Sequence, residues 1–182
     1  NDDDIKDHAL MTEAVHRHGA LAGVELWIGG ARTANLYTRE VSMDVASMPN
    51  LAGHAYQSRA MDKSDIRELR RWHRNAALRA KAAGFDVVYV YATHGYLLSH
   101  FLSAETNTRG DEYGGSMENR ARLLRELIED TKDAVGDRCA VAVRYSVGGD
   151  DGEDPSLTNE RRDRLEMLAE LPDLWDININ NY

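Results

Sequence analysis

The segment Gly84-Phe-Asp-Val-Val-Tyr-Val-Tyr-Ala-Thr-His-Gly-Tyr96 decides the fold class of this 182-residue chain. The run from Val87 to Val90 favours β structure without alternating polar residues, which predicts a parallel strand covered on both faces. Tyr91 and His94 follow at the carboxyl end of that strand. Parallel α/β barrels keep their chemistry at the carboxyl ends of their strands, so we interpret these two residues as candidate catalytic residues. The alternative for this segment alone is a core tyrosine followed by a loop histidine.

The chain as a whole alternates helix and strand four times, which predicts a parallel sheet with helices outside it. The helices are expected at residues 5–18, 63–83, 117–135 and 159–170, and the strands at residues 21–27, 87–91, 140–145 and 175–179. Asp62 or Ser64 is placed to cap the second helix, and Ser116 the third. The connections at residues 28–61 and 93–115 exceed the usual length of about two to six residues, so they are expected to be functional or mobile.

Charge and hydropathy indicate a soluble enzyme and argue against a nucleic-acid partner. The formal net charge is −9 and the pI is near 5.2, whereas phosphate recognition needs clustered Lys and Arg. The basic residues around positions 67–81 and 120–125 have helical spacing and are interpreted as solvated helix faces. The sequence contains no targeting segment and no apolar run approaching about 18 residues, so we expect a cytoplasmic protein without a membrane partner.

Neither cysteine nor histidine spacing predicts a metal site. The single cysteine, Cys139, excludes an internal disulfide and any multi-cysteine site within the chain. Its apolar neighbours predict an inert buried thiol. The histidines other than His94 share no ligand spacing, and we assign no role to His8, His16, His18, His54, His73 and His100.

Two charged residues interrupt apolar strand segments. Glu25 stands in Gly23-Val-Glu-Leu-Trp27, where an unpaired buried carboxylate would cost on the order of several kcal/mol, so it needs a donor. Arg144 stands in Val141-Ala-Val-Arg-Tyr145 and needs an anionic or carbonyl partner, because arginine does not lose its proton. One solution is a salt bridge between strands, for instance from Glu25 to Arg144.

Several segments together form a longer pattern. Gly23-Val-Glu-Leu-Trp-Ile-Gly-Gly30 lies upstream of His94, and Asn107-Thr-Arg-Gly-Asp-Glu-Tyr-Gly-Gly-Ser-Met-Glu-Asn-Arg120 lies downstream, followed by residues 140–146. In this order and spacing the chain resembles the Old Yellow Enzyme family of flavin-dependent TIM barrels over essentially its whole length. Within the family it looks most like the amine dehydrogenase branch, which includes the trimethylamine, dimethylamine and histamine dehydrogenases.

The resemblance implies an α/β fold that is a partial TIM (β/α)8 barrel of about four consecutive β/α units, the third to the sixth. A complete barrel needs roughly 250 residues, so all 182 residues are expected to be an internal fragment of a single FMN-binding barrel domain. The competing topology is an open doubly wound sheet, but residues 27–32 lack its Gly-x-Gly-x-x-Gly spacing. Residues 107–120 are expected to be structural, with Arg109, Asp111 and Arg120 in one buried polar network.

On the cofactor side, the resemblance implies that Glu25 accepts a hydrogen bond from the flavin N3–H. It places Arg144 against the flavin N1 and C2 carbonyl, where a fixed cation stabilises the reduced anion. The family commonly has His where this chain has Ile28, so any role of that histidine is lost here.

On the substrate side, the resemblance assigns Tyr91 and His94, where ene-reductase relatives have His with His or Asn. A neutral Tyr and His can tune the protonation of an amine. Trp27 and Tyr96 are candidate walls of the substrate pocket through cation–π contact, with core packing as the alternative.

The predicted function is therefore oxidation of a small, methylated amine with electron transfer to FMN, as in trimethylamine dehydrogenase. For the full-length parent we expect a 4Fe–4S cluster with ligands outside this chain, an electron-acceptor protein and a homo-oligomeric state. Two alternatives remain open: an NAD(P)H-dependent 2-enoate reductase of the same family, and an inactive truncated barrel. The fragment alone is expected to be inactive.

Overall fold

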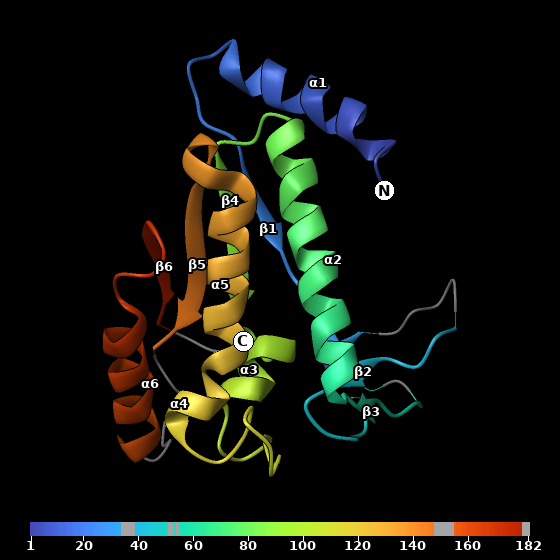
Figure 1. The fold of residues 1–182 in the computed structure, drawn as a ribbon, viewed down its shortest axis with the longest axis vertical. Coiled ribbons are helices and arrows are strands. Elements are labelled where there is room, and N and C mark those ends of the chain that lie inside the picture. The colour runs from blue at the N-terminus through green and yellow to red at the C-terminus, as the bar shows by residue number, and fades with distance from the viewer. Residues whose placement is uncertain (34–38, 51–52, 54, 148–154, 180–182) are drawn as a thin grey trace.

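A four-stranded parallel sheet forms the centre of the computed structural model, which describes residues 1–33, 39–50, 53, 55–147 and 155–179. Its strands pair in chain order: β1 (Gly23–Leu26), β4 (Val87–Ala92), β5 (Ala140–Ser146) and β6 (Leu174–Asn178). Because neighbours in the chain are neighbours in the sheet and all run in parallel, the sheet is a consecutive arc of β/α units (Figure 1). This confirms the predicted α/β class and parallel sheet.

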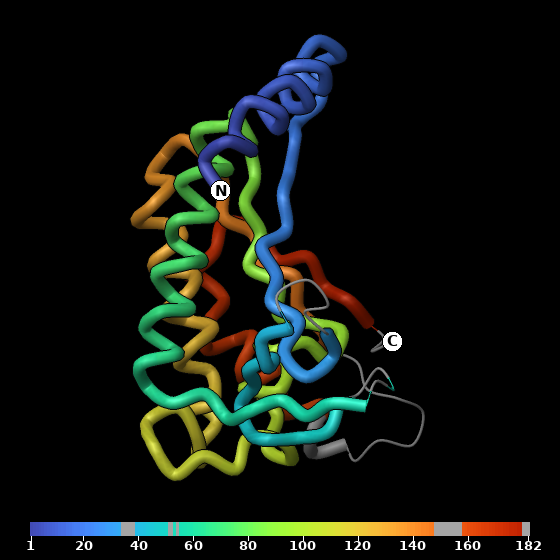
Figure 2. Tube along the Cα trace, turned by 90° about the vertical axis from the view of Figure 1, so that its right-hand side faces the viewer, coloured from blue at the N-terminus to red at the C-terminus, as the bar shows by residue number. Residues whose placement is uncertain are grey.

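The helices alternate with these strands as α1 (Asp4–His16), α2 (Lys63–Ala82), α5 (Arg122–Val135) and α6 (Pro155–Leu168). Figure 2 shows α2 and α5 side by side along one face of the sheet, with α1 across the end where the strands begin. The core fills the space between this helical layer and the sheet. Its fully buried members come from both layers and include Val88, Val90, Val143, Leu127 and Ile128.

Local sequence explains where α2 and α5 form. The Asp62 carboxylate accepts from the backbone N–H groups of Ser64 and Asp65 at 2.7 and 2.9 Å, and the Asp65 carboxylate accepts from the Asp62 N–H at 2.8 Å. This capping box satisfies amides that would otherwise lack partners, which confirms Asp62 as the cap. In α5, Leu124 and Ile128 recur at helical spacing and are buried against the sheet.

The expectation that the central strand is covered on both faces is wrong for the described residues. Burial alternates along β4, because successive side chains point to opposite faces and helices cover only one of them. The covered face holds Val88 and Val90. The opposite face, here called the inner face, carries the half-buried Val87, Tyr89 and Tyr91.

The two long connections contain short elements that the sequence did not predict. After β1 come the turn η1 (Gly30–Arg32) and a parallel pair, β2 (Met43–Asp44) with β3 (Arg59–Ala60). After β4 comes α3 (Leu97–Leu102), which is too short and too uniformly apolar to show helical periodicity. The predicted third helix is divided into α4 (Met117–Arg120), capped by Ser116, and α5. These elements gather at the carboxyl ends of the strands (Figure 1).

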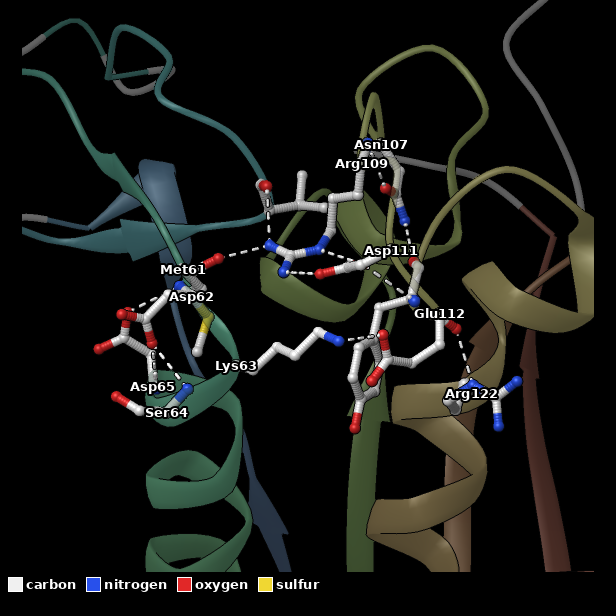
Figure 3. Close-up of polar contacts among 12 residues, drawn as sticks. Met61, Asp62, Lys63, Ser64, Asp65, Asn107, Arg109, Asp111, Glu112 and Arg122 are labelled. Atoms are coloured by element: carbon white, nitrogen blue, oxygen red, sulfur yellow. Dashed lines mark hydrogen bonds and ion pairs between the residues drawn. The ribbon is translucent and has the colours of Figure 1, made fainter.

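Residues 107–120 form two polar clusters rather than the single predicted network. Arg109 pairs with Asp111 through two hydrogen bonds, of 3.0 and 2.5 Å, and donates to the Met61 carbonyl just before α2 (Figure 3). Lys63 of α2 pairs with Glu112 at 2.6 Å beside it (Figure 3).

The second cluster lies on the other side of the block. Arg120 donates to the Leu102 carbonyl at 3.2 Å and pairs with Glu160 of α6 at 2.5 Å. The prediction of one network was therefore wrong. Arg109 joins the block to the backbone just before α2, whereas Arg120 joins it to α6.

The two buried histidines and the buried cysteine have structural partners. His73 is buried with its Nε2 3.0 Å from the Thr131 hydroxyl, and His100 lies 2.8 Å from the fully buried carboxylate of Asp44. Cys139 is buried and donates to the Phe85 carbonyl, and burial raises the pKa of its thiol, which confirms the predicted inert cysteine. His54 lies outside the described residues. In the described ranges, no group of three His, Cys, Asp or Glu side chains could hold a metal ion.

Candidate active site

The inner face of the sheet carries a row of charged and aromatic side chains near the carboxyl ends of the strands. Register places Tyr91 of β4 opposite Arg144 of β5, and Arg144 opposite Asp176 of β6. Glu25 of β1 lies opposite Tyr89, which is two residues before Tyr91 and on the same face of β4. Parallel pairing in register therefore brings together side chains that are more than 100 positions apart in the chain.

Glu25 and Arg144 form an ion pair of 2.7 Å, so the salt bridge considered as the alternative for Glu25 is present. Their side chains remain 37% and 32% exposed, so both groups can still contact a ligand on the inner face. The Glu25 carboxylate also raises the pKa of Arg144 through their hydrogen bond. The pair therefore places a hydrogen-bond acceptor, the Glu25 carboxylate, beside a hydrogen-bond donor, the Arg144 guanidinium.

One donor of the Arg144 side chain has no acceptor. Its Nε atom is buried without a hydrogen-bond partner in the described part of the chain, and a carboxylate oxygen of Asp176 is 3.6 Å away. An unsatisfied buried donor costs roughly 1–3 kcal/mol. An acceptor of the kind that the flavin pyrimidine ring offers would remove that cost, while Glu25 offers the matching acceptor for an N–H.

Tyr91 and His94 contact each other directly: the Tyr91 hydroxyl is hydrogen-bonded to His94 Nδ1. Burial, then the Arg144 cation, lowers the pKa of His94, while burial, then the Glu25 carboxylate, raises the pKa of Tyr91. Both shifts favour the neutral forms at neutral pH. The pair can therefore hold or relay one proton without carrying charge at rest.

Backbone geometry fixes the direction of the His94 side chain. His94 has a φ of 59° and Gly95 a φ of 66°, so two consecutive residues adopt the left-handed conformation just after β4. Histidine enters this region at a cost of about 1 kcal/mol or more, and such strained residues concentrate at functional sites. The turn points the imidazole back along the strand towards Tyr91.

Aromatic rings continue the site beyond this pair. The Trp27 and Tyr96 rings lie 4.9 Å apart and the Tyr91 and Tyr96 rings 5.8 Å apart, measured between centroids. Trp27 remains 50% exposed, so core packing does not explain it. The structure thus brings the six residues singled out in the sequence to one end of the inner face.

Three residues of this region were not singled out by the sequence. Asp176 lies beside Arg144, and the Asn178 side-chain nitrogen is 3.4 Å from His94 Nε2. Arg32 of η1 donates to the His94 carbonyl and lies over the Tyr96 ring at 6.0 Å. Alternation along β6 puts Asp176 and Asn178 on one face, which was a usable signal, whereas nothing local connects Arg32 to His94.

A cavity of about 840 Å³ lies elsewhere, between α2 and the edge of the sheet formed by β1. Glu25 and Trp27 border it, but Tyr91, His94 and Arg144 do not. The largest share of its lining comes from the connection after β1, with residues such as Ile28 and Val41, and α2 adds Leu69 and Trp72. We attribute it to the unpaired strand edge and place the chemistry on the inner face instead.

This arrangement, parallel β/α units with polar groups at the carboxyl ends of the strands, is that of a TIM-barrel enzyme. A solved structure of similar fold is 6-hydroxypseudooxynicotine amine oxidase from Pseudomonas geniculata N1, which is 46% identical with a TM-score of 0.95 over 100% of this chain and 28% of that one. The partial-barrel prediction is confirmed. The profile of the NADH:flavin oxidoreductase / NADH oxidase family, the Old Yellow Enzyme-like flavoproteins, matches residues 1–180, and the chain belongs to that family.

The curated relatives include an amine dehydrogenase and NADPH dehydrogenases. Dimethylamine dehydrogenase of Hyphomicrobium sp. (strain x) is 35% identical over 98% of this chain and 25% of its own length. NADPH dehydrogenase of Halalkalibacterium halodurans is 37% identical over 85% of this chain and 45% of its own length. The chain thus spans a quarter of the length of the first of these two relatives and just under half of the second. In the described residues, no helix has the length and apolar character needed to cross a bilayer.

Proposed function

We propose that this chain belongs to an FMN-dependent enzyme that oxidises a small amine at the carbon next to nitrogen. Glu25 and Arg144 hold the flavin, and Tyr91 and His94 face the substrate. The observation that supports this most directly is the contact between Tyr91 and His94 on the same face as the Glu25–Arg144 pair. The dimethylamine dehydrogenase and amine oxidase relatives support the substrate class.

Bound FMN would supply the acceptor for the two electrons that leave the amine. The chain itself handles the proton that the substrate ammonium must lose before its nitrogen can support an iminium ion. His94 is neutral, so its Nδ1 can accept the proton of the Tyr91 hydroxyl while that hydroxyl takes a proton from the ammonium. The Arg144 cation beside both groups favours this neutral resting state of His94.

The aromatic rings supply binding for the amine. Trp27 and Tyr96 present faces that attract an alkylammonium ion by about 0.5–2 kcal/mol each. An amine held between these rings and the Tyr91 hydroxyl would lie at the carboxyl end of the strands, where Glu25 and Arg144 also project.

A second candidate is an NAD(P)H-dependent 2-enoate reductase, which the NADPH dehydrogenase relative supports. In this reading Tyr91 and His94 would donate hydrogen bonds to a carbonyl oxygen. Tyr91 in place of the His typical of ene reductases, and Glu25 in place of Gln, favour the amine. An inactive truncated barrel is the third candidate, because the outer edges of β1 and β6 pair with no other strand among the described residues.

For the parent protein we further propose a 4Fe–4S cluster with ligands outside this chain, an electron-acceptor protein, a homo-oligomeric state and a cytoplasmic location. We also propose that residues 1–182 are an internal part of one FMN-binding domain. The length relationship to the curated relatives supports the last point.

The deciding experiment follows flavin absorbance in the natural full-length protein under anaerobic conditions. Trimethylamine, dimethylamine and histamine are each added alone, and NADPH is added in a parallel cuvette and followed by an enone. Bleaching by an amine alone supports amine oxidation. Bleaching by NADPH alone, reversed by the enone, supports the reductase and rejects the amine. A purified protein without flavin supports the inactive barrel.

A further inference from the structure

Arg32 contacts the His94–Gly95 turn at more than one point. Arg32 lies in η1, after β1, whereas His94 follows β4. The contact therefore joins two different connections through residues that are 62 positions apart. The Arg32 Nη1 donates to the His94 carbonyl. The same guanidinium packs on Gly95: a β-carbon added there would lie 3.3 Å from Nη1 and 3.6 Å from Cζ. The guanidinium therefore lies directly against the Gly95 backbone, and a side chain there would push it back by a few tenths of an ångström.

The contact falls on the strained part of the backbone. His94 is one of two non-glycine residues with positive φ among the described residues, and Gly95 follows it in the left-handed region. A left-handed turn exposes carbonyl oxygens that helices and strands would have satisfied. A charged donor on the His94 carbonyl offsets the cost of the conformation, because charge-assisted hydrogen bonds are the strong ones.

Arg32 is also held on its other side. Its Cζ lies 6.0 Å from the centroid of the Tyr96 ring, which itself packs against Trp27. The preceding residue is anchored as well, since the Ala31 N–H donates to the buried Asp44 carboxylate at 2.6 Å. The guanidinium therefore reaches His94 from a fixed base rather than from a free loop.

We infer that Arg32 is a positioning residue for the proposed reaction: it locks the left-handed His94–Gly95 turn and so directs the His94 imidazole to the Tyr91 hydroxyl. This inference rests on the proposed function of His94. Arg32 lies in the connection between β1 and α2. The other proposed site residues, apart from Tyr96, lie in strands or directly after them.

Charge has a second consequence at the same place. The charged groups that face His94 are Arg144 of β5 and Arg32 of η1, which lower its pKa, and Glu25 of β1, which raises it; burial lowers it further. Removal of the Arg32 cation therefore raises the pKa of His94. A purely structural arginine remote from the imidazole would leave that pKa unchanged.

The test uses the natural full-length holoenzyme and its amine substrate, with flavin reduction measured across pH. We expect Arg32→Met to reduce the rate at least about tenfold and to move the acid limb of the profile to higher pH. Arg32→Lys keeps the charge, so the limb stays near its original pH while the rate remains low. Arg71→Met is the matched control, because Arg71 is exposed on α2 and pairs only with Glu68 among the contacts described.

A crystal structure of the Arg32→Met protein gives a readout that does not depend on activity. We expect residue 94 to leave the positive-φ region and its ring to lose contact with Tyr91. Arg32→Gln, which is shorter and uncharged, tests the same contact if Arg32→Met fails to fold. An Arg32→Met protein with normal flavin content, unchanged φ at residue 94 and an unchanged pH profile overturns the inference.

His94→Gln, measured in parallel, separates the two proposals. If His94→Gln reduces flavin with amine as fast as the parent does, the proposed role of His94 fails. The crystallographic readout for Arg32 then still decides whether it locks the turn. If His94→Gln is slow and Arg32→Met is normal in rate, profile and backbone, only the inference about Arg32 fails.

Discussion

Tyr91 and Arg144 are register partners on neighbouring strands, and the Arg144 Cζ lies 5.9 Å from the centroid of the Tyr91 ring. The group proposed to face the flavin therefore touches the group proposed to face the substrate. Burial is the main cause of both shifts, raising the pKa of Tyr91 and lowering the pKa of His94. The Arg144 cation acts to lower both pKa values, against the raising effect of Glu25. The charge of Arg144, on the proposed flavin side, is therefore linked to the proton affinities of Tyr91 and His94, on the proposed substrate side.

Removing the Tyr91 hydroxyl should slow amine oxidation. Tyr91→Phe keeps the ring against Arg144 and Tyr96 but deletes the contact with His94 Nδ1. We expect the rate of flavin reduction by amine to fall by about 10²- to 10⁴-fold, the usual range for general acid–base catalysis. Stopped-flow absorbance measures it. Tyr89→Phe, on the same face two residues earlier, is the control, and equal rates for both variants would contradict the proposed role.

The pH profile of amine oxidation should reflect the lowered pKa of His94. The neutral imidazole is the active form, and burial and Arg144 lower its pKa, so activity at saturating amine should persist below the ordinary histidine pKa of about 6.5. Glu25 raises the pKa of His94, so Glu25→Gln should move the acid limb to still lower pH. Glu68→Gln, on the exposed side of α2, should not move it. A limb that shifts upward in Glu25→Gln would refute this assignment.

The buried His73 should make stability depend on pH. Burial lowers the pKa of His73 to about 4 in the folded protein, against about 6.5 in the unfolded chain. The unfolded state therefore binds the proton first, and the stabilisation, present above pH 6.5, is lost as pH falls towards 4. Its size is on the order of a few kcal/mol.

Urea unfolding at pH 7.5 and 4.5 measures this dependence in the full-length protein. Carboxylates also titrate in this range, so the relevant quantity is the difference between the parent and His73→Gln. We expect the free energy of unfolding of the parent to fall more steeply than that of the variant. Parallel pH dependences would show that His73 is not buried as described.

The contact between α5 and the sheet should be a major contribution to stability. Leu127 is fully buried between the two layers, so Leu127→Ala should lower the free energy of unfolding by about 2–5 kcal/mol. Leu78→Ala, at a position on α2 that is 41% exposed, should change it by less than about 1 kcal/mol. Chemical denaturation compares the two. A similar loss for both would mean that α5 does not pack on the sheet as described.

Much of the fold was predictable because local signals agreed with it. The apolar run of β4, the Asp62 cap and the α5 periodicity each belong to one short stretch of chain, and each element formed where it was expected. The short helix α3 was missed because six residues are too few to show a period. The prediction that β4 is covered on both faces was wrong, because burial of a strand depends on which elements pack on the sheet and not on the strand itself.

The candidate site was predictable only in part. Glu25 and Arg144 were singled out because charge inside an apolar strand needs a partner, but the sequence left open whether that partner was a ligand or each other. Their 2.7 Å contact depends on strand order. Arg32 gave no local signal, since its partner, the His94 carbonyl, lies 62 positions away.

By itself, the sequence determined the four strands of the central sheet, the long helices between them and the residue types at the strand ends, because hydrophobic period and capping act over a few neighbouring residues. Tertiary structure alone decided that Glu25 meets Arg144, that Arg32 reaches the His94 turn and that Arg109 and Arg120 join one loop to different parts of the fold. These contacts depend on the register of parallel strands and on the close approach of distant loops, which no local stretch of sequence encodes.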